Sequence, residues 1–78
     1  MLAKKVFKEI VNLCYDEDYP ELHQELLSLE TTLRKTKDYE NGIGEAIQAI
    51  QMYTEDFPED IMDDIENLHQ EYLDSLEN

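Results

Sequence analysis

Several residue types are scarce in this 78-residue chain, and each shortage narrows its structural class. With no Trp, two Gly, two Pro and few runs of β-branched residues, the composition favours helices. The single Cys excludes an internal disulfide and fits a reducing cytoplasm. No apolar run approaches the roughly 18 residues that a membrane span needs, and the polar residues soon after Met1 are not those of a signal peptide. We therefore expect a small cytoplasmic protein without a transmembrane segment.

Basic residues are also scarce, and all of them lie in the first half of the chain. Residues 1–39 hold eight acidic and six basic residues, a net charge of −2, whereas residues 40–78 hold twelve acidic residues and no basic one, a net charge of −12. The sum of −14 opposes direct binding to nucleic acid or to an anionic membrane. A basic protein partner would be attracted. The alternative is that the acidity only keeps the protein soluble.

One heptapeptide occurs twice, with five identities between its copies. Residues 15–21 read YDEDYPE, and residues 53–59 read YTEDFPE. Each copy is followed by apolar residues at spacings of four, three and four, which form one stripe of an α-helix. The stripes are Leu22, Leu26, Leu29 and Leu33 in the first half, and Ile61, Ile65, Leu68 and Tyr72 in the second.

The repeated heptapeptide predicts the start of a helix at each copy. Asp18 and Asp56 are predicted N-caps, because an Asp side chain there accepts hydrogen bonds from the free amides of the next turn. Pro is tolerated in the first turn, and the Glu three residues after each Asp completes a capping box. Binding of Ca²⁺ by these acidic turns is the alternative interpretation, although the residue order of a calcium loop is missing.

The apolar periodicity predicts four helices. We expect them at about residues 2–15, at 19–36, from a start after Asp38 or Asn41 to Tyr53, and at 57–76. Cys14 falls on the apolar face of the first helix and is predicted to be an unreactive core residue. The Gly42–Gly44 stretch is predicted to be a turn or a close helix crossing.

The expected fold is all-α, an antiparallel four-helix bundle built from two similar αα-hairpins. A single domain spans residues 1–78, with one hairpin at 2–37 and the other at 39–77. Each hairpin exposes an apolar face that it cannot bury alone, so we expect the two to stack face to face. The alternatives are a tandem of tetratricopeptide-like units, whose usual period is shorter, and helix pairs that join in a homodimer.

The chain offers few groups for catalysis. Glu66 and His69 have the Glu-x-x-His spacing of a di-metal bundle, but no second such motif exists, since Pro20 precedes His23 by three residues. No Ser has a base placed near it in the sequence. We therefore expect neither an enzyme nor a bound cofactor or metal.

The six cations have two different settings. Lys4, Lys5 and Lys8 lie early in the first predicted helix, where positive charge opposes the helix dipole. We expect them to attract the acidic half across the bundle. The cations in residues 34–37 crowd the end of the second helix, where the dipole favours them, which is a sufficient structural reason for them; a basic contact patch is the alternative.

Because we expect no catalytic or metal site, we expect the chain to act through a surface that binds another protein. The charge asymmetry predicts a non-enzymatic interaction protein that neutralises or regulates a basic protein partner. The candidate contact residues are Glu55, Glu59, Asp63 and Glu66. The alternative is a structural or regulatory helical module that homodimerises.

One stretch of the chain resembles a known family. Residues 29–40, the Ile43, Ile47 and Ile50 stripe and the Asp-Phe-Pro sequence at 56–58 resemble bacteriocin immunity proteins of lactic-acid bacteria. The resemblance implies an antiparallel four-helix bundle and a cytoplasmic bacterial protein that protects its producer from a membrane-active peptide. That family has no catalytic residues to transfer, and its members are usually longer and often basic.

Overall fold

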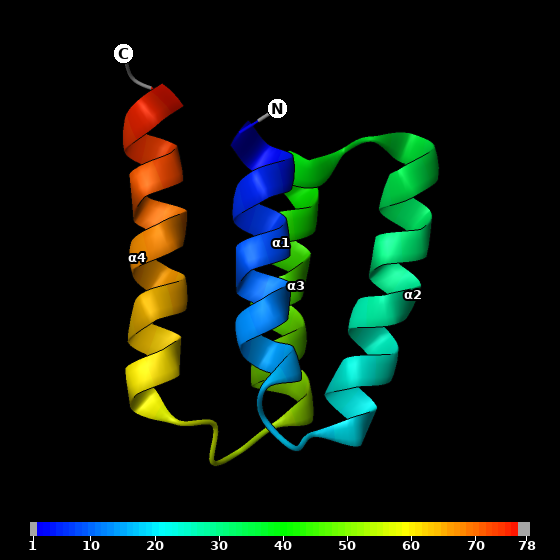
Figure 1. Cartoon of the computed structure of the whole chain (residues 1–78), viewed down its shortest axis with the longest axis vertical. Coiled ribbons are helices and arrows are strands. Elements are labelled where there is room, and N and C mark those ends of the chain that lie inside the picture. Colours follow the sequence, from blue (N-terminus) through cyan, green and yellow to red (C-terminus); the bar gives the residue numbers. More distant parts are fainter. Residues whose placement is uncertain (1, 77–78) are drawn as a thin grey trace.

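Four helices account for most of residues 2–76, the part of the chain that the computed structural model describes. They are α1 (Leu2–Tyr15), α2 (Pro20–Thr36), α3 (Tyr39–Tyr53) and α4 (Glu59–Leu76). Each helix runs antiparallel to the next, and residues 2–76 contain no strand (Figure 1). The predicted all-α four-helix bundle is therefore confirmed.

The helix bounds follow the apolar periodicity closely. α1 has the predicted bounds, and α3 starts directly after Asp38, the first of the two predicted positions. α2 begins at Pro20 and α4 at Glu59, one and two residues later than predicted. Proline causes the delay at α2, because it keeps the preceding Tyr19 out of the helical conformation, at φ −131° and ψ 83°.

The predicted capping role of Asp18 is wrong. Tyr19 occupies the N-cap position of α2, and no side chain within residues 2–76 caps this helix by a hydrogen bond. The residue before a first-turn Pro is itself the N-cap, so Asp18 lies one residue too early. Asp56 likewise lies before the start of α4, and its carboxylate accepts a hydrogen bond from the Tyr19 hydroxyl instead.

The helices pack in a way that interleaves the two halves of the chain. The central pair is α1 and α3, while α2 packs against α3 and α4 packs against α1. Figure 1 shows this arrangement, with α2 and α4 on opposite sides of the central pair. Each half thus places its second helix mainly on the first helix of the other half, rather than forming a closed hairpin that stacks on its copy. The two halves thus have equivalent places in the packing, since α1 and α3 form the centre and α2 and α4 lie outside.

The core lies along the α1–α3 pair and receives one apolar stripe from each outer helix. Its largest fully buried side chains are Phe7, Ile10, Val11, Cys14, Leu22, Leu26, Ile43, Ile50 and Ile65. No polar or charged residue within 2–76 is buried, so the charges all remain in contact with water. The exposed faces are therefore where any binding function of the described residues must lie.

Gly42 marks a close approach of α2 and α3. It is buried within α3, and a Cβ atom at this position would collide with the Leu33 side chain of α2. Of the two predicted roles for the glycine stretch, the close helix crossing is confirmed and the turn is wrong. Gly44 has a different environment, because a Cβ atom there would meet no described atom within 4 Å outside its own helical turn.

Candidate functional site

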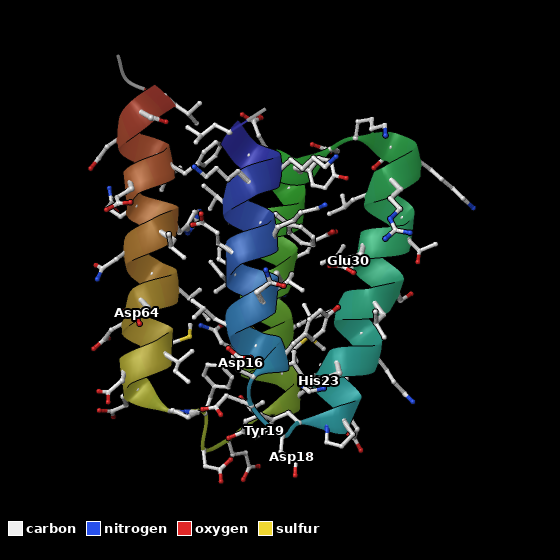
Figure 2. All side chains as sticks on the ribbon, in the orientation of Figure 1. Asp16, Asp18, Tyr19, His23, Glu30 and Asp64 are labelled. Carbon is white, nitrogen blue, oxygen red and sulfur yellow. The ribbon has the colours of Figure 1, made fainter. Side chains whose placement is uncertain are left out.

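The two copies of the heptapeptide meet at one end of the bundle. The ring centroids of Tyr19 and Phe57, which occupy equivalent positions, lie 5.5 Å apart. The Tyr19 hydroxyl donates to the backbone carbonyl of Asp56 at 3.1 Å and to its carboxylate at 3.3 Å. Burial, followed by the negative charge of Asp56, raises the pKa of Tyr19. This contact fixes the turn that leads into α4 against the turn that leads into α2. Figure 2 shows Tyr19 at the end of the bundle where these two turns lie.

The four candidate contact residues lie on or just before α4. Glu59, Asp63 and Glu66 follow one another at spacings of four and three, so they share one side of the helix. Glu55 lies in the turn that precedes α4. All four side chains are exposed to solvent. The structure thus brings three of the predicted residues onto one helical surface and places the fourth at its start.

These residues belong to a wider acidic face. All seven acidic residues of α4 are exposed, and they lie opposite the buried Ile65 and Tyr72. The seven are Glu59, Asp60, Asp63, Asp64, Glu66, Glu71 and Asp74. We call this set, together with Glu55, the α4 acidic face. Figure 2 shows one member, Asp64, on the side of the molecule away from α2.

The chemical groups of this face are carboxylates, so the property that it offers is negative charge. Within residues 2–76, no three His, Cys, Asp or Glu side chains converge to hold a metal ion. Glu66 is exposed and His69 is half-buried, so the Glu-x-x-His pair spans the edge of the α4 acidic face. The face can attract a cationic surface.

A second set of titratable groups lies between α1 and α2, where it stabilises the fold. The His23 Nε2–H donates to the backbone carbonyl of Cys14 at 3.0 Å, and the His23 ring meets that of Tyr15 edge to face. Burial raises the pKa of the Cys14 thiol to about 12, as expected for an unreactive core residue. Burial and then the charge of Glu30 raise the pKa of Tyr15 to about 12. Neither the Cys14 thiol nor the Tyr15 phenol therefore ionises near neutral pH.

The attraction predicted between the lysines of α1 and the acidic half produces no ion pair among the described residues, although Lys5 lines a groove with Glu71 of α4. Among residues 2–76, no Lys or Arg lies within ion-pair distance of a carboxylate. Of the three lysines of α1, Lys5 lines the groove between α1 and α4, while Lys4 and Lys8 face a cleft toward α2. That cleft also receives Arg34 and Lys37. Sequence reasoning missed it, although antiparallel packing of the first two helices would bring residues 4–8 beside residues 34–37.

Comparisons with known proteins add no family to these observations. No family model matches the chain, and no curated protein or solved structure matches it. The resemblance to bacteriocin immunity proteins therefore stays a prediction. None of the helices within residues 2–76 combines the length and the apolar character that crossing a membrane requires.

Proposed function

We propose that this protein is a non-enzymatic interaction protein that binds a basic protein partner through the α4 acidic face and so neutralises or regulates that partner. One observation carries the proposal: seven exposed carboxylates cover one side of α4, in a half of the chain that has no basic residue. A surface of this kind steers a cationic partner and accelerates its association.

The energetics support a use for this surface beyond solubility. Seven like charges along one 18-residue helix repel one another and oppose folding. A mixed surface would give the same solubility with less repulsion. The six cations that could offset the repulsion all lie outside α3 and α4. A partner that supplies the missing positive charge would relieve the repulsion on binding.

The more specific form of the proposal is an immunity-type protein. The resemblance of residues 29–40 and 56–58 to bacteriocin immunity proteins supports this form, as does the four-helix architecture. In that setting the protein acts in the bacterial cytoplasm, where its single thiol stays reduced. Expression of the gene in a sensitive strain, followed by exposure to membrane-active peptides, tests this form separately from partner binding.

A homodimer is the second candidate, and exposed apolar side chains favour it. Leu2 and Leu76 line a hollow of about 480 Å³ at one end of the bundle, beside Tyr39 and Tyr72. Leu2 is 48% exposed and Leu76 is 57% exposed. A second copy could bury these side chains, but two chains that each carry a charge of −14 repel each other. Sedimentation at low and high salt decides whether the chain self-associates.

The proposal is tested by capture of the partner with the purified chain. The face variant carries Glu55→Gln, Glu59→Gln, Asp63→Asn and Glu66→Gln, which removes four charges and keeps the side-chain shapes. We expect the wild-type chain to retain a basic protein at low salt and to release it at high salt, because exposed charge pairs are screened. The face variant should lose most of this capture.

A matched control separates the α4 acidic face from net charge. The control variant carries Glu9→Gln, Asp16→Asn, Asp18→Asn and Glu21→Gln, four exposed acids of α1, α2 and the turn between them. It has the same net charge as the face variant. Equal loss of capture in both variants would mean that total charge, rather than the α4 acidic face, holds the partner.

A further inference from the structure

The strongest concentration of positive charge on this acidic protein lies in one cleft between α1 and α2. The cleft has a volume of about 310 Å³. Four of the six cations of the chain line it: Lys4, Lys8, Arg34 and Lys37. Phe7 and Tyr39, which are 1% and 4% exposed, contribute its apolar floor. We call this site the α1–α2 basic cleft.

The four cations of the cleft are available to a ligand. All four side chains are exposed, and none lies within ion-pair distance of a carboxylate of residues 2–76, although the chain has twenty acidic residues. Lys4 places its Nζ over the ring of Tyr39, 5.9 Å from the ring centroid, which holds this ammonium group at the cleft. Glu30 is the single acid in the lining, so four positive charges face one negative charge.

Two of these residues carry a structural cost: Lys4 through its charge and Lys37 through its backbone conformation, although the dipole of α2 favours the charge of Lys37. Lys4 lies in the first turn of α1, where the helix dipole disfavours positive charge. Lys37 ends α2 in a left-handed conformation, at φ 63° and ψ 13°, while its N–H donates to the carbonyl of Leu33 at 2.8 Å. Gly or Asn is the usual residue in that conformation, because a Cβ atom raises its energy. A Lys at this position has a structural cost, and the cleft supplies a reason for it.

From these observations we infer that the α1–α2 basic cleft binds a small phosphorylated molecule. Arg34 offers the planar fork that suits two phosphate oxygens, and the three lysines add ammonium donors. Glu30 lies one helical turn before Arg34 on α2, and Asn12 lies one turn after Lys8 on α1; both line the cleft, and their oxygens can accept hydrogen bonds from the hydroxyl groups of a ligand. The ligand class is therefore a phosphate ester that carries hydroxyl groups, such as a sugar phosphate. Figure 2 shows Glu30 directed from α2 toward α1.

The charge of the rest of the protein disfavours larger anions. A nucleic acid strand would extend beyond a cleft of this volume onto a surface with a strong negative charge, where its phosphates are repelled. The acidic face of a second copy would bring two chains of −14 together. A compact dianion avoids both penalties, because within the cleft it meets four cations and a single acid, Glu30.

The inference is tested by titrating the full chain with ribose 5-phosphate at constant ionic strength and following backbone amide shifts by NMR. Parallel titrations use inorganic phosphate, ribose and an acidic peptide that lacks phosphate. We expect saturable shifts around Lys4, Lys8 and residues 34–37 with ribose 5-phosphate, weaker binding of phosphate at the same amides, and no binding of ribose. Tighter binding of the acidic peptide, or the absence of saturable shifts at millimolar ribose 5-phosphate, would overturn the inference.

The remaining two cations of the chain provide a matched control. The cleft variant carries Arg34→Gln and Lys37→Asn, and the control variant carries Lys5→Gln and Lys35→Gln, which lie outside the cleft lining. Both variants lose two positive charges. We expect the cleft variant to bind ribose 5-phosphate roughly ten-fold more weakly or worse, and the control variant to bind nearly as wild type. Equal weakening in both would show nonspecific attraction and would overturn the inference.

Lys37→Gly separates ligand binding from stability. Glycine relieves the strained left-handed conformation, so the thermal midpoint should rise, while the loss of one ammonium group should weaken ribose 5-phosphate binding several-fold. A variant that is more stable but binds less tightly supports a ligand role for Lys37. A more stable variant with unchanged affinity would overturn its assignment to the site.

Discussion

The Tyr19 and Phe57 rings are in contact, with their centroids 5.5 Å apart and their planes inclined by 36°. The two residues hold the same place in the two copies of the heptapeptide, so this contact joins equivalent positions of the two halves. Because the Tyr19 hydroxyl also donates to Asp56, the first turn of the chain is joined to the third. The heptapeptide therefore links the two halves of the bundle as well as preceding a helix in each half.

The different environments of Asp18 and Asp56 predict unequal effects of their removal. Asp18 is exposed and forms no hydrogen bond with any of residues 2–76, so Asp18→Ala should change the free energy of unfolding by less than about 0.5 kcal/mol. Asp56→Ala removes a partner of Tyr19 and should lower the thermal midpoint by a few degrees. Thermal unfolding followed by circular dichroism measures both. A clear loss of stability in Asp18→Ala would restore the capping interpretation.

Tyr19→Phe tests the same contact from its other side. The ring keeps its packing against Phe57, while both hydrogen bonds to Asp56 are lost. The thermal midpoint should fall, and adding Asp56→Ala should lower it by less than the sum of the two single changes. Full additivity would show that the hydroxyl and the carboxylate do not interact in solution.

The two glycines of α3 predict opposite responses to the same substitution. Gly44→Ala should stabilise the protein by about 0.5–1 kcal/mol, because Ala favours a helix and its methyl group meets open space. Gly42→Ala should be less favourable than Gly44→Ala by about 1–3 kcal/mol, because its methyl group collides with Leu33. Chemical denaturation measures both values.

A third variant tests the reason for this difference. In a Leu33→Ala background the collision is absent, so Gly42→Ala should become stabilising there. If Gly42→Ala is equally unfavourable in both backgrounds, the close crossing of α2 and α3 does not explain the glycine.

The raised pKa values of the buried Cys14 thiol and the half-buried Tyr15 phenol predict a loss of stability at alkaline pH. The pKa of Cys14 rises from 9.0 to about 12, and that of Tyr15 rises from 10.0 to about 12. Above the unfolded-state values the unfolded chain releases protons that the folded chain retains, so stability falls as the pH increases. We expect a falling thermal midpoint from pH 9 toward 12.

Cys14→Ala isolates the contribution of the thiol. In the unfolded chain the pKa of Cys is 9.0 and that of Tyr is 10.0. Between pH 9 and pH 10 the thiol is therefore the first of the two groups to ionise there. The variant should therefore show a flatter pH dependence than the wild type in this window. An identical slope would contradict the buried, protonated thiol.

The helices were predictable because each carries one continuous apolar stripe. The stripe of Leu22, Leu26 and Leu33 is buried in α2, and Ile65 and Tyr72 are buried in α4. The position of the cap was not predictable from the Asp-x-Pro-Glu pattern alone. That pattern allows two registers, and the restriction that proline imposes on Tyr19 selects the later one.

Long-range placement was harder to predict than helix position. Periodicity shows which face of α4 is apolar, but it does not show whether that face meets α3 or α1, since both offer apolar stripes. The α1–α2 basic cleft was not predicted for the same reason. Lys4 and Arg34 are thirty residues apart in the sequence, and they line one cleft only because the helices pack antiparallel. By contrast, the exposure of Glu59, Asp63 and Glu66 follows from their helical spacing relative to Ile65.

The most direct test of the proposed function is the dissociation constant of the captured partner, measured over a series of salt concentrations for the wild-type chain, the face variant and the control variant. The α4 acidic face predicts roughly ten-fold or greater loss of affinity in the face variant, together with a weaker dependence on salt. The control variant should keep both the affinity and the salt dependence of the wild type. Identical behaviour of the two variants, or an affinity of the wild-type chain that salt does not change, would contradict binding through the α4 acidic face.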